Sequence, residues 1–334
     1  MKTRIYILLT FKLLSLCVLG YNFNLDLSNV NNYSKNLINS SNNESVNNFK
    51  SNDTLLNLFT SKKNKISNQN DTLTYLFMGH IYQWGSGGNR VDYRVESIDF
   101  NQFDGIWLGG DICSETSLNY STVEYVDNLF DLGNQNNHWT LGNHDVRNGN
   151  IEWIKNFTNR PTYYASYNNG LTIVVLNTNL SPLDCENIDK QFKMIKNVCD
   201  TISHGHLIFI AHHGIYQNVP GVKDPSEYAH SSLKNWLGNC YSESGDYLNT
   251  IYPLIVEVEN RGVQVKHIMG DVGTHTKSYY GISEDGVEYF GSGINNSYNL
   301  HNGTDITNAD LLLIFKHVIS TNELFWEFIE LNDF

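Results

Sequence analysis

Residues 138–145 read HWTLGNHD, and this stretch is the clearest guide to the architecture of the chain. A mixed, partly apolar run reaches Gly142 and is followed at once by Asn143, His144 and Asp145. Four other stretches have the same layout: YLFMGH ends at His80, IWLGGD at Asp111, LIFIAHH at His212 and His213, and KHIMGD at Asp271. Polar groups directly after five such runs indicate strands whose ends meet at one site.

The segments between these stretches alternate in periodicity. Apolar runs of strand length are expected to form strands at 72–79, 105–110, 162–167, 171–178, 206–212 and 263–270, and helical spacing predicts helices at 90–100, 121–133, 186–202 and 247–262. Four further strands are expected at 277–283, 287–293, 310–319 and 323–331. Alternation followed by a strand-rich tail predicts an α/β fold, a four-layer α/β/β/α sandwich of two mixed sheets.

The beginning of the chain has a different composition. Lys2 and Arg4 precede a mostly apolar run from Ile5 to Leu19, which predicts a secretory signal peptide at residues 1–20 and a secreted or secretory-pathway protein. Lys12 interrupts this run, so an ordinary amphipathic N-terminus is the alternative. Residues 21–70 are rich in Asn and Ser and are predicted to be a flexible segment, which leaves residues 71–334 as the domain.

Composition excludes some classes of function. The 334 residues carry a formal net charge of -13, so no nucleic-acid partner is expected. No run after the signal reaches ~18 apolar residues, so no membrane span is expected. Asn-x-Ser/Thr sequons, such as those at Asn119 and Asn156, are compatible with a secreted glycoprotein. Disulfides are allowed: Cys185 is open to pair with Cys199 or Cys240, and Cys113 is expected to be a buried thiol.

The side chains at the strand ends suit a metal. Asp111, Asn143, His212 and Asp271 offer two carboxylates, an amide oxygen and an imidazole, a mixed set that favours Zn, Mn or Fe. His144 is then a natural general acid, and Asp145 is expected to orient it by a hydrogen bond.

The motifs GGD, GNHD and AHH, with GD in place of a final Gly-His-x-His, resemble the calcineurin-like metallophosphoesterase superfamily and its purple acid phosphatase-like members over roughly residues 73–300. The resemblance implies a two-metal centre that hydrolyses phosphoester substrates. It implies that Asp111 bridges the metals, that Asn143 and His212 are ligands, and that His144 protonates the leaving group.

The chain departs from the family pattern in its first and last motifs. His80 stands where the family has a ligand aspartate, and Tyr82 stands where many members have another histidine. Asp271 replaces the first histidine of the last motif, Gly273 replaces the second, and His275 is displaced by two residues. Tyr82, Glu115 and His275 are further candidate ligands of the first metal site. We interpret His80 and Asp271 as an imidazole and a carboxylate exchanged between two strand ends, and we expect one metal ion, or two of unequal affinity.

The same residues leave simpler readings open. His80 taken alone is more often structural than a ligand, and Asp271 is open to being a turn residue. His213 is expected to contact substrate or to satisfy a backbone carbonyl. With these altered ligands, the alternative to a phosphoesterase is a catalytically degenerate member of the family that serves as a binding or scaffold protein.

Overall fold

The computed structural model describes residues 71–83, 88–180, 184–227, 229, 246–272, 278–294 and 309–334. They belong to one compact unit, residues 70–334. The predicted signal peptide and the Asn/Ser-rich segment up to residue 70 lie outside the described residues. Within the described part of the chain, no helix is long and apolar enough to cross a membrane.

The first sheet is built around strand β1, whose alternating pattern places side chains on both faces. Its strand order is β11-β10-β1-β2-β3. The bounds are β1 Thr72–Met78, β2 Gly105–Leu108, β3 His138–Trp139, β10 Leu311–Val318 and β11 Glu323–Glu330. β1, β2 and β3 run parallel, whereas β10 and β11 add two antiparallel pairings, so the sheet is mixed.

The second sheet is also mixed, with the order β4-β5-β6-β7-β9-β8. The bounds are β4 Tyr164–Asn168, β5 Leu171–Val175, β6 His206–Ala211, β7 Gln264–Met269, β8 Ser278–Ile282 and β9 Glu288–Ser292. β5, β6, β7 and β9 are parallel, and β4 and β8 are antiparallel edges. The hairpin between β4 and β5 turns at Asn169 and Gly170, which both have positive φ, as a two-residue type I′ turn requires.

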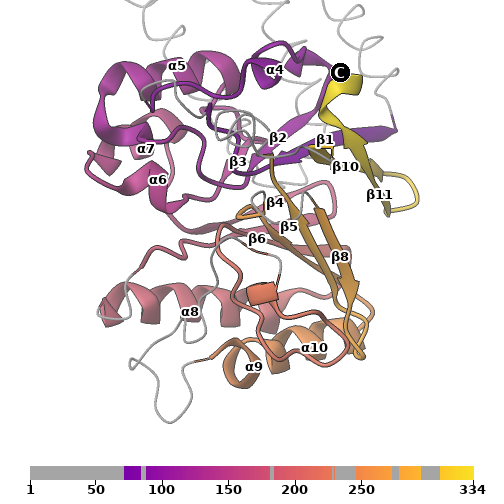
Figure 1. The fold of residues 1–334 in the computed structure, drawn as a ribbon. Helices are drawn as coiled ribbons and strands as arrows, with labels where there is room; N and C mark the ends of the chain where they lie inside the picture. The colour runs from indigo at the N-terminus through magenta and orange to yellow at the C-terminus, as the bar shows by residue number, and fades with distance from the viewer. Residues whose placement is uncertain are drawn as a thin grey trace, which may run out of the picture. The chain divides into compact units, whose positions relative to one another are not determined.

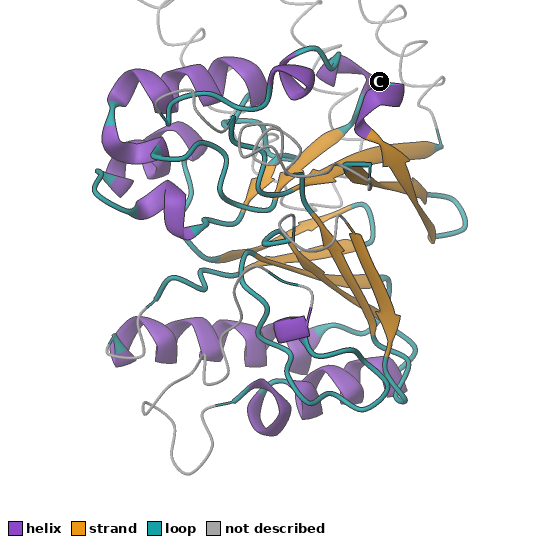
Figure 2. Cartoon of the chain, viewed as in Figure 1, coloured by secondary structure: helices purple, strands orange, loops and turns teal. Residues whose placement is uncertain are grey.

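Helices cover the outer face of each sheet (Figures 1 and 2). The first sheet is covered by α4 Tyr93–Glu96, α5 Tyr120–Phe130, α6 Asn143–Val146 and α7 Ile151–Thr158. The second sheet is covered by α8 Cys185–Thr201, α9 Tyr247–Thr250 and α10 Tyr252–Asn260. Short 3-10 turns occupy Phe100–Gln102, Thr116–Leu118, Pro225–Glu227 and Leu331–Asp333.

Three apolar layers hold the four structural layers together. Side chains of both sheets, such as Phe77, Ile208 and Phe315, form the layer between the sheets. Leu76 and Val126 belong to the layer under the first group of helices, and the remaining layer packs α8 and α10 against the second sheet. Successive residues of β1 therefore face different layers, as the period of a strand requires. The predicted α/β/β/α sandwich of two mixed sheets is confirmed.

Three predicted helices differ from the structure. The one expected over 90–100 is only α4, Tyr93–Glu96, followed by the 3-10 turn Phe100–Gln102. The helix expected to stop at Gly133 stops earlier, because Asp131 takes a left-handed conformation (φ 49°) and its N–H donates to Asp127. The helix expected over 247–262 is two helices that meet at Ile251. Pro253 lacks the N–H that would continue the first helix, so it begins a new one instead.

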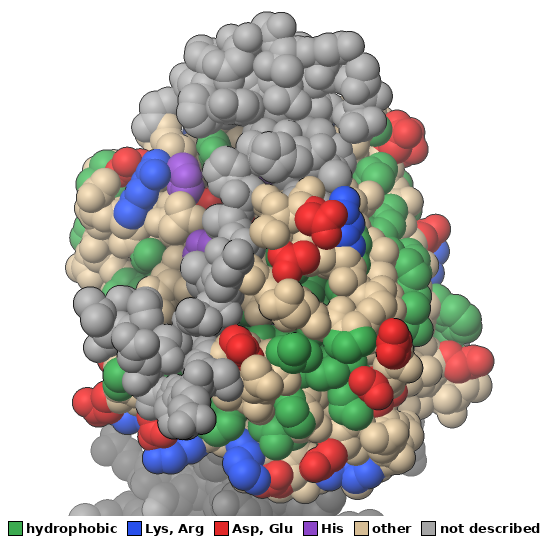
Figure 3. All heavy atoms as spheres, turned by 60° about the horizontal axis from the view of Figure 1, so that its bottom comes forward, with side chains coloured by type: hydrophobic (Ala, Val, Ile, Leu, Met, Phe, Trp, Pro, Cys, Tyr) green, Lys and Arg blue, Asp and Glu red, His purple; other side chains and the backbone are tan. Residues whose placement is uncertain are grey.

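The cysteines and surface charges add two observations. Cys113 is a buried free thiol as expected, and Cys199 is also free, which excludes a Cys185–Cys199 bridge. Cys185 is disulfide-bonded, and the other two described cysteines are free, so its partner lies outside the described residues. On the face drawn in Figure 3, acidic and basic side chains are interspersed.

Candidate metal centre

Glycines let the backbones of the two sheets meet where the candidate ligands begin. A Cβ added at Gly79, after β1, would lie 2.4 Å from the Cα of Gly270, after β7. A Cβ at Gly270 would lie 1.9 Å from the carbonyl oxygen of Gly109, after β2. No larger residue fits these approaches, since Cβ contacts below about 3 Å clash. The glycine before each polar side chain therefore brings the ends of three strands, from both sheets, to one place.

The loops after β1 and β2 are locked to each other. His80 and Asp111 both have left-handed backbone, with φ of 53° and 55°. Such a conformation costs about 1–3 kcal/mol per residue and persists only where the surroundings enforce it. Here the N–H of His80 donates to Gly110 (2.8 Å), and the N–H of Ile81 donates to Asp111 (3.1 Å). These bonds hold the side chains of His80 and Asp111 beside each other.

Five of the predicted site residues form two overlapping groups of metal-binding type. Ligand atoms of His80, Asp111 and Asp271 lie within 4.8 Å of one another, and so do those of His212, His213 and Asp271. All five side chains are buried, with exposed fractions between 0% and 7%. Asp271 belongs to both groups. The structure thus brings together side chains from the ends of β1, β2, β6 and β7.

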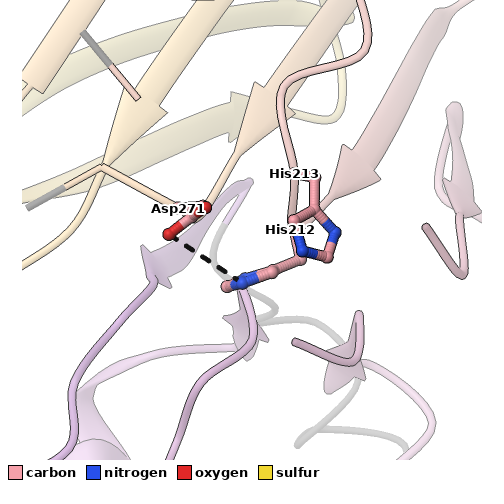
Figure 4. A group of neighbouring side chains, drawn as sticks. All are labelled: His212, His213 and Asp271. Carbon is pink, nitrogen blue, oxygen red and sulfur yellow. Dashed lines mark ion pairs between the residues drawn. The ribbon is translucent and has the colours of Figure 1, made fainter. Parts of the chain in front are cut away.

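His212 is the best-defined member of these groups. Its Nδ1 donates to the carbonyl oxygen of Gly109 (2.8 Å), which turns Nε2 toward the carboxylates. Nε2 lies 3.5 Å from Oδ2 of Asp111 and 4.0 Å from Oδ1 of Asp271, as Figure 4 shows for the second pair. Among the described residues, this fully buried atom has no hydrogen-bond partner. A buried polar atom in that position indicates that something else belongs between the three side chains.

The spacing fits a metal ion. Two ligand atoms bound at about 2.1 Å to one ion, at a tetrahedral angle, lie about 3.4 Å apart. The 3.5 Å between His212 and Asp111 is close to that value and too long for a strong hydrogen bond. Carboxylate oxygens and imidazole nitrogens are also the donors that Zn, Mn and Fe share. The donor set therefore fits the predicted cofactor class of divalent or trivalent ions.

Without a metal, the same side chains perturb one another strongly. Burial alone would lower the pKa of His212, but the charges of Asp111 and Asp271 outweigh it and raise that pKa to about 10. Burial would raise the pKa of Asp111, but the facing imidazole of His212 holds it well below its usual range. A metal ion bound at Nε2 of His212 would displace this proton, because a ligand imidazole is neutral.

His213 is fixed by Thr178, a residue that belongs to none of the motifs. Its Nδ1 lies 2.7 Å from the hydroxyl of Thr178, and its backbone N–H donates to the same hydroxyl. Burial, followed by the charge of His212, lowers the pKa of His213 to about 4. The hydrogen-bond partner is thus a threonine rather than the backbone carbonyl we considered, and His213 joins His212 and Asp271 as a candidate ligand. Contact with substrate remains a prediction.

Asp145 does not orient His144 as we expected. Its two oxygens accept hydrogen bonds from the backbone of Asp111 (2.8 Å), Ile112 (3.0 Å) and Gly142 (2.8 Å). The hydroxyl of Thr116 also donates to it (2.6 Å). A buried carboxylate satisfied in this way joins the loops after β2 and β3, so Asp145 shapes the site through the backbone of Asp111.

His144 is held by a carbonyl oxygen instead. Its Nδ1 lies 2.8 Å from the carbonyl of Ser114, its backbone N–H donates to Oδ1 of Asp111, and its Nε2 is 4.0 Å from Oδ2 of Asp111. The side chain is 16% exposed. Asn143, the first residue of α6, is exposed, and its role as a ligand remains a prediction.

The further candidate ligands of the first metal site lie in different surroundings. Glu115 lies 3.6 Å from the guanidinium of Arg147 at the surface. Tyr82 stacks on His144, with ring centroids 5.0 Å apart. Gly273 and His275 lie outside the described residues.

Comparisons with known proteins give distant matches. No family model matches the chain, and no curated protein does. Among solved structures, purple acid phosphatase PPD1 from yellow lupin seeds is 11% identical, with a TM-score of 0.42, over 79% of this chain. The match spans about half of the lupin protein, 52%.

Two further solved structures are similar at the same level. Phosphopantetheinyl hydrolase from Mycobacterium tuberculosis is 12% identical, with a TM-score of 0.39, over 69% of this chain and 93% of its own. Vacuolar protein sorting 29 from Cryptosporidium parvum is 9% identical, with a TM-score of 0.29, over 78% of this chain and 97% of its own. Function must therefore be argued from the site.

Proposed function

We propose that this chain is a metal-dependent phosphoester hydrolase with an altered ligand set. One observation carries the proposal: buried carboxylates and imidazoles from four strand ends converge, and the inward nitrogen of His212 has no hydrogen-bond partner among the described residues. Convergent, buried ionisable groups with strongly perturbed pKa values are typical of functional sites. The motif resemblance to metallophosphoesterases supplies the reaction class.

His80, Asp111, His212 and Asp271 would hold the ion, with His213 and Asn143 as further candidates. A bound ion of this kind supplies Lewis acidity toward a phosphoryl oxygen and toward water. The protein contributes a buried framework that keeps these donors fixed, because the glycine contacts and the bonds of Asp145 leave the loops little freedom.

His144 would supply the proton that the leaving oxygen needs. Since a carbonyl oxygen only accepts, Nδ1 must be the donor to Ser114, so Nε2 carries a transferable proton when the ring is the imidazolium cation. Nε2 lies 4.0 Å from Oδ2 of Asp111, and the side chain is 16% exposed, so the ring is open to solvent. A positioned general acid contributes roughly 100- to 10,000-fold to such a reaction.

The test combines metal content with turnover. Purified protein should contain Zn, Mn or Fe and hydrolyse an aryl phosphate, and Asp111→Ala should lose both while its far-UV circular dichroism stays native-like. Glu186→Ala, which removes an exposed carboxylate on α8, is the matched control and should change neither. A metal-loaded wild type that hydrolyses no phosphomonoester or phosphodiester would instead favour the binding or scaffold alternative.

We also propose that the protein enters the secretory pathway through residues 1–20. The basic start and the apolar run that follows motivate this proposal. Mass spectrometry of protein from its native source should find a mature N-terminus near residue 20. An intact chain that still begins at Met1 would contradict it.

A further inference from the structure

The ring of Tyr82 lies flat on the ring of His144. Their centroids are 5.0 Å apart and their planes differ by 18°. The ring of Tyr82 also contacts that of His80, with centroids 4.7 Å apart and planes 54° apart. Tyr82 is itself only 8% exposed. A buried side chain from the loop after β1 therefore contacts both a candidate ligand and the candidate acid.

The hydrogen bond of His144 restrains the tilt of its ring only loosely. The bond from Nδ1 to Ser114 holds one edge of the ring. A hydrogen bond to a carbonyl oxygen tolerates a range of angles, and the torsion about the Cβ–Cγ bond of histidine is broad, so this bond alone leaves the plane a range of tilts. The direction of Nε2, which would deliver the proton, depends on that tilt. A flat aromatic neighbour supplies the missing constraint, since stacked rings resist tilting.

Tyr82 is well placed to act as that constraint because its own backbone is held. Tyr82 forms a β-bridge with Val91, and the next residue, Gln83, donates its N–H to Arg90 (3.0 Å). Ile81 donates to Asp111 and accepts from Asp92 (2.7 Å). The segment that carries Tyr82 is thus joined to the loop after β2, which also carries Ser114. Both constraints on His144 rest on one rigid framework.

We propose that Tyr82 is a positioning residue that holds the imidazole plane of His144 for proton donation to the leaving group. This rests on the proposed function. Misplacement of a catalytic group by about 1 Å can cost on the order of 100-fold in rate, so a tilt that moves Nε2 is costly. The cost should appear only in the step that needs the proton.

The experiment compares two substrates that differ in their need for an acid. 4-Nitrophenyl phosphate releases an acidic phenol that leaves without much help, whereas phenyl phosphate releases a basic oxyanion that needs protonation. Tyr82→Ala should lower kcat for phenyl phosphate by roughly 10- to 100-fold and kcat for 4-nitrophenyl phosphate by much less, with KM nearly unchanged. Tyr82→Phe, which keeps the ring, should stay within about threefold of wild type for both substrates.

Two controls separate positioning from damage. The first control is the metal content of Tyr82→Ala, which should equal that of wild type. It is needed because Tyr82 contacts the candidate ligand His80, and loss of metal would also lower the rate. In a His144→Ala background, adding Tyr82→Ala should change the rate by less than about twofold, because the group it positions is already gone.

The outcomes distinguish this inference from the function on which it rests. Equal losses on both substrates, loss of metal from Tyr82→Ala, or failure of Tyr82→Phe to retain the rate would each overturn the role of Tyr82. Absence of turnover by metal-loaded wild type would overturn the proposed function, and the role of Tyr82 with it.

Discussion

Two histidines of the second sheet are fully buried and have opposite surroundings. His212 follows β6, and His267 lies within the neighbouring strand β7, four residues before Asp271. Both have an exposed fraction of 0%. The pKa of His212 is raised to about 10, because the charges of Asp111 and Asp271 outweigh burial, whereas burial lowers the pKa of His267 to about 3.

The difference comes from the layer that each ring faces. His267 points toward the helices, where it lies among aromatic rings: Phe209 and Tyr289 stack on it, with centroids at 5.5 and 5.9 Å, and Tyr216 and Tyr247 approach at 5.1 and 5.6 Å. Neither ring nitrogen has a hydrogen-bond partner among the described residues. His212 faces two carboxylates instead. Both imidazoles are buried, so burial does not distinguish them. The neighbouring carboxylates are what mark His212 as a candidate metal ligand.

The comparison predicts that substitution of His212 removes bound metal and that substitution of His267 does not. His212→Leu should reduce metal affinity by more than about 100-fold and remove hydrolysis, because a direct ligand is lost. His267→Phe should keep metal and rate, since Phe preserves the stacked ring and removes no hydrogen bond. Metal content after dialysis and aryl phosphate turnover measure both effects. Equal metal content in the two variants would break the distinction between these histidines.

A third histidine, His144, extends the comparison to a partly exposed ring. His144→Ala should retain metal and lose roughly 100- to 10,000-fold in turnover of phenyl phosphate, because it removes the acid that this leaving group needs and removes no ligand. The exposed His204 supplies a control, and His204→Ala should leave the rate unchanged. If His144→Ala lost its metal together with its activity, His144 would belong with His212 rather than form a separate class.

Much of the fold follows from the sequence because burial on both faces leaves a plain signature. The runs LTIVV and HLIFIA are continuous and apolar, as parallel strands covered on both sides must be, and they form β5 and β6. Two of the three wrong helix predictions have local causes: a left-handed Asp131 is permitted but not required by its sequence, and Pro253 starts a helix as readily as it ends one.

The candidate site was predictable only in part. Strand ends that share an edge must meet, so the convergence of His80, Asp111, His212 and Asp271 could be anticipated. The neighbours that assign roles could not, because they come from loops. The acceptor for His144 is the backbone carbonyl of Ser114, which any residue would offer. Asp145 satisfies loop backbone that no periodicity describes.

His80 is a candidate ligand like His212 or a packing residue like His267. A double-mutant cycle with Asp271 decides between these two roles. Its neutral imidazole and the carboxylate of Asp271 carry the same total charge as the family's reversed pair. His80→Asp would place three carboxylates in one buried group, raise the pKa of one of them and weaken the fold without metal. His80→Asp with Asp271→His should recover about 1–3 kcal/mol of the summed losses.

Metal stoichiometry and denaturant unfolding of the two single variants and the double variant measure this coupling. Coupling of that size would mean that His80, like His212, belongs to the charged group of the candidate metal site. Additive losses at positions 80 and 271 would place it with His267, as a histidine that only packs, and its ligand role would be withdrawn.

The dependence of stability on pH tests whether His267 is uncharged in the folded protein. Its pKa is about 3 in the folded protein and 6.5 when unperturbed, so the unfolded chain binds the proton first as pH falls. The associated stability is complete above pH 6.5 and is lost progressively toward pH 3, by up to about 1.4 kcal/mol per pH unit. His138, whose pKa burial also lowers to about 3, adds a similar slope, so wild type loses stability steeply in this window.

His267→Phe removes one of these protons. Its free energy of unfolding between pH 6.5 and 4, from urea titrations, should therefore fall less steeply than that of wild type, by up to about 1.4 kcal/mol per pH unit. The difference in slope isolates His267, because any constant cost of the new ring shifts both ends of the window equally. Parallel slopes would mean that His267 is already charged or solvated in the folded protein, and the aromatic surroundings could not then be what separates it from His212.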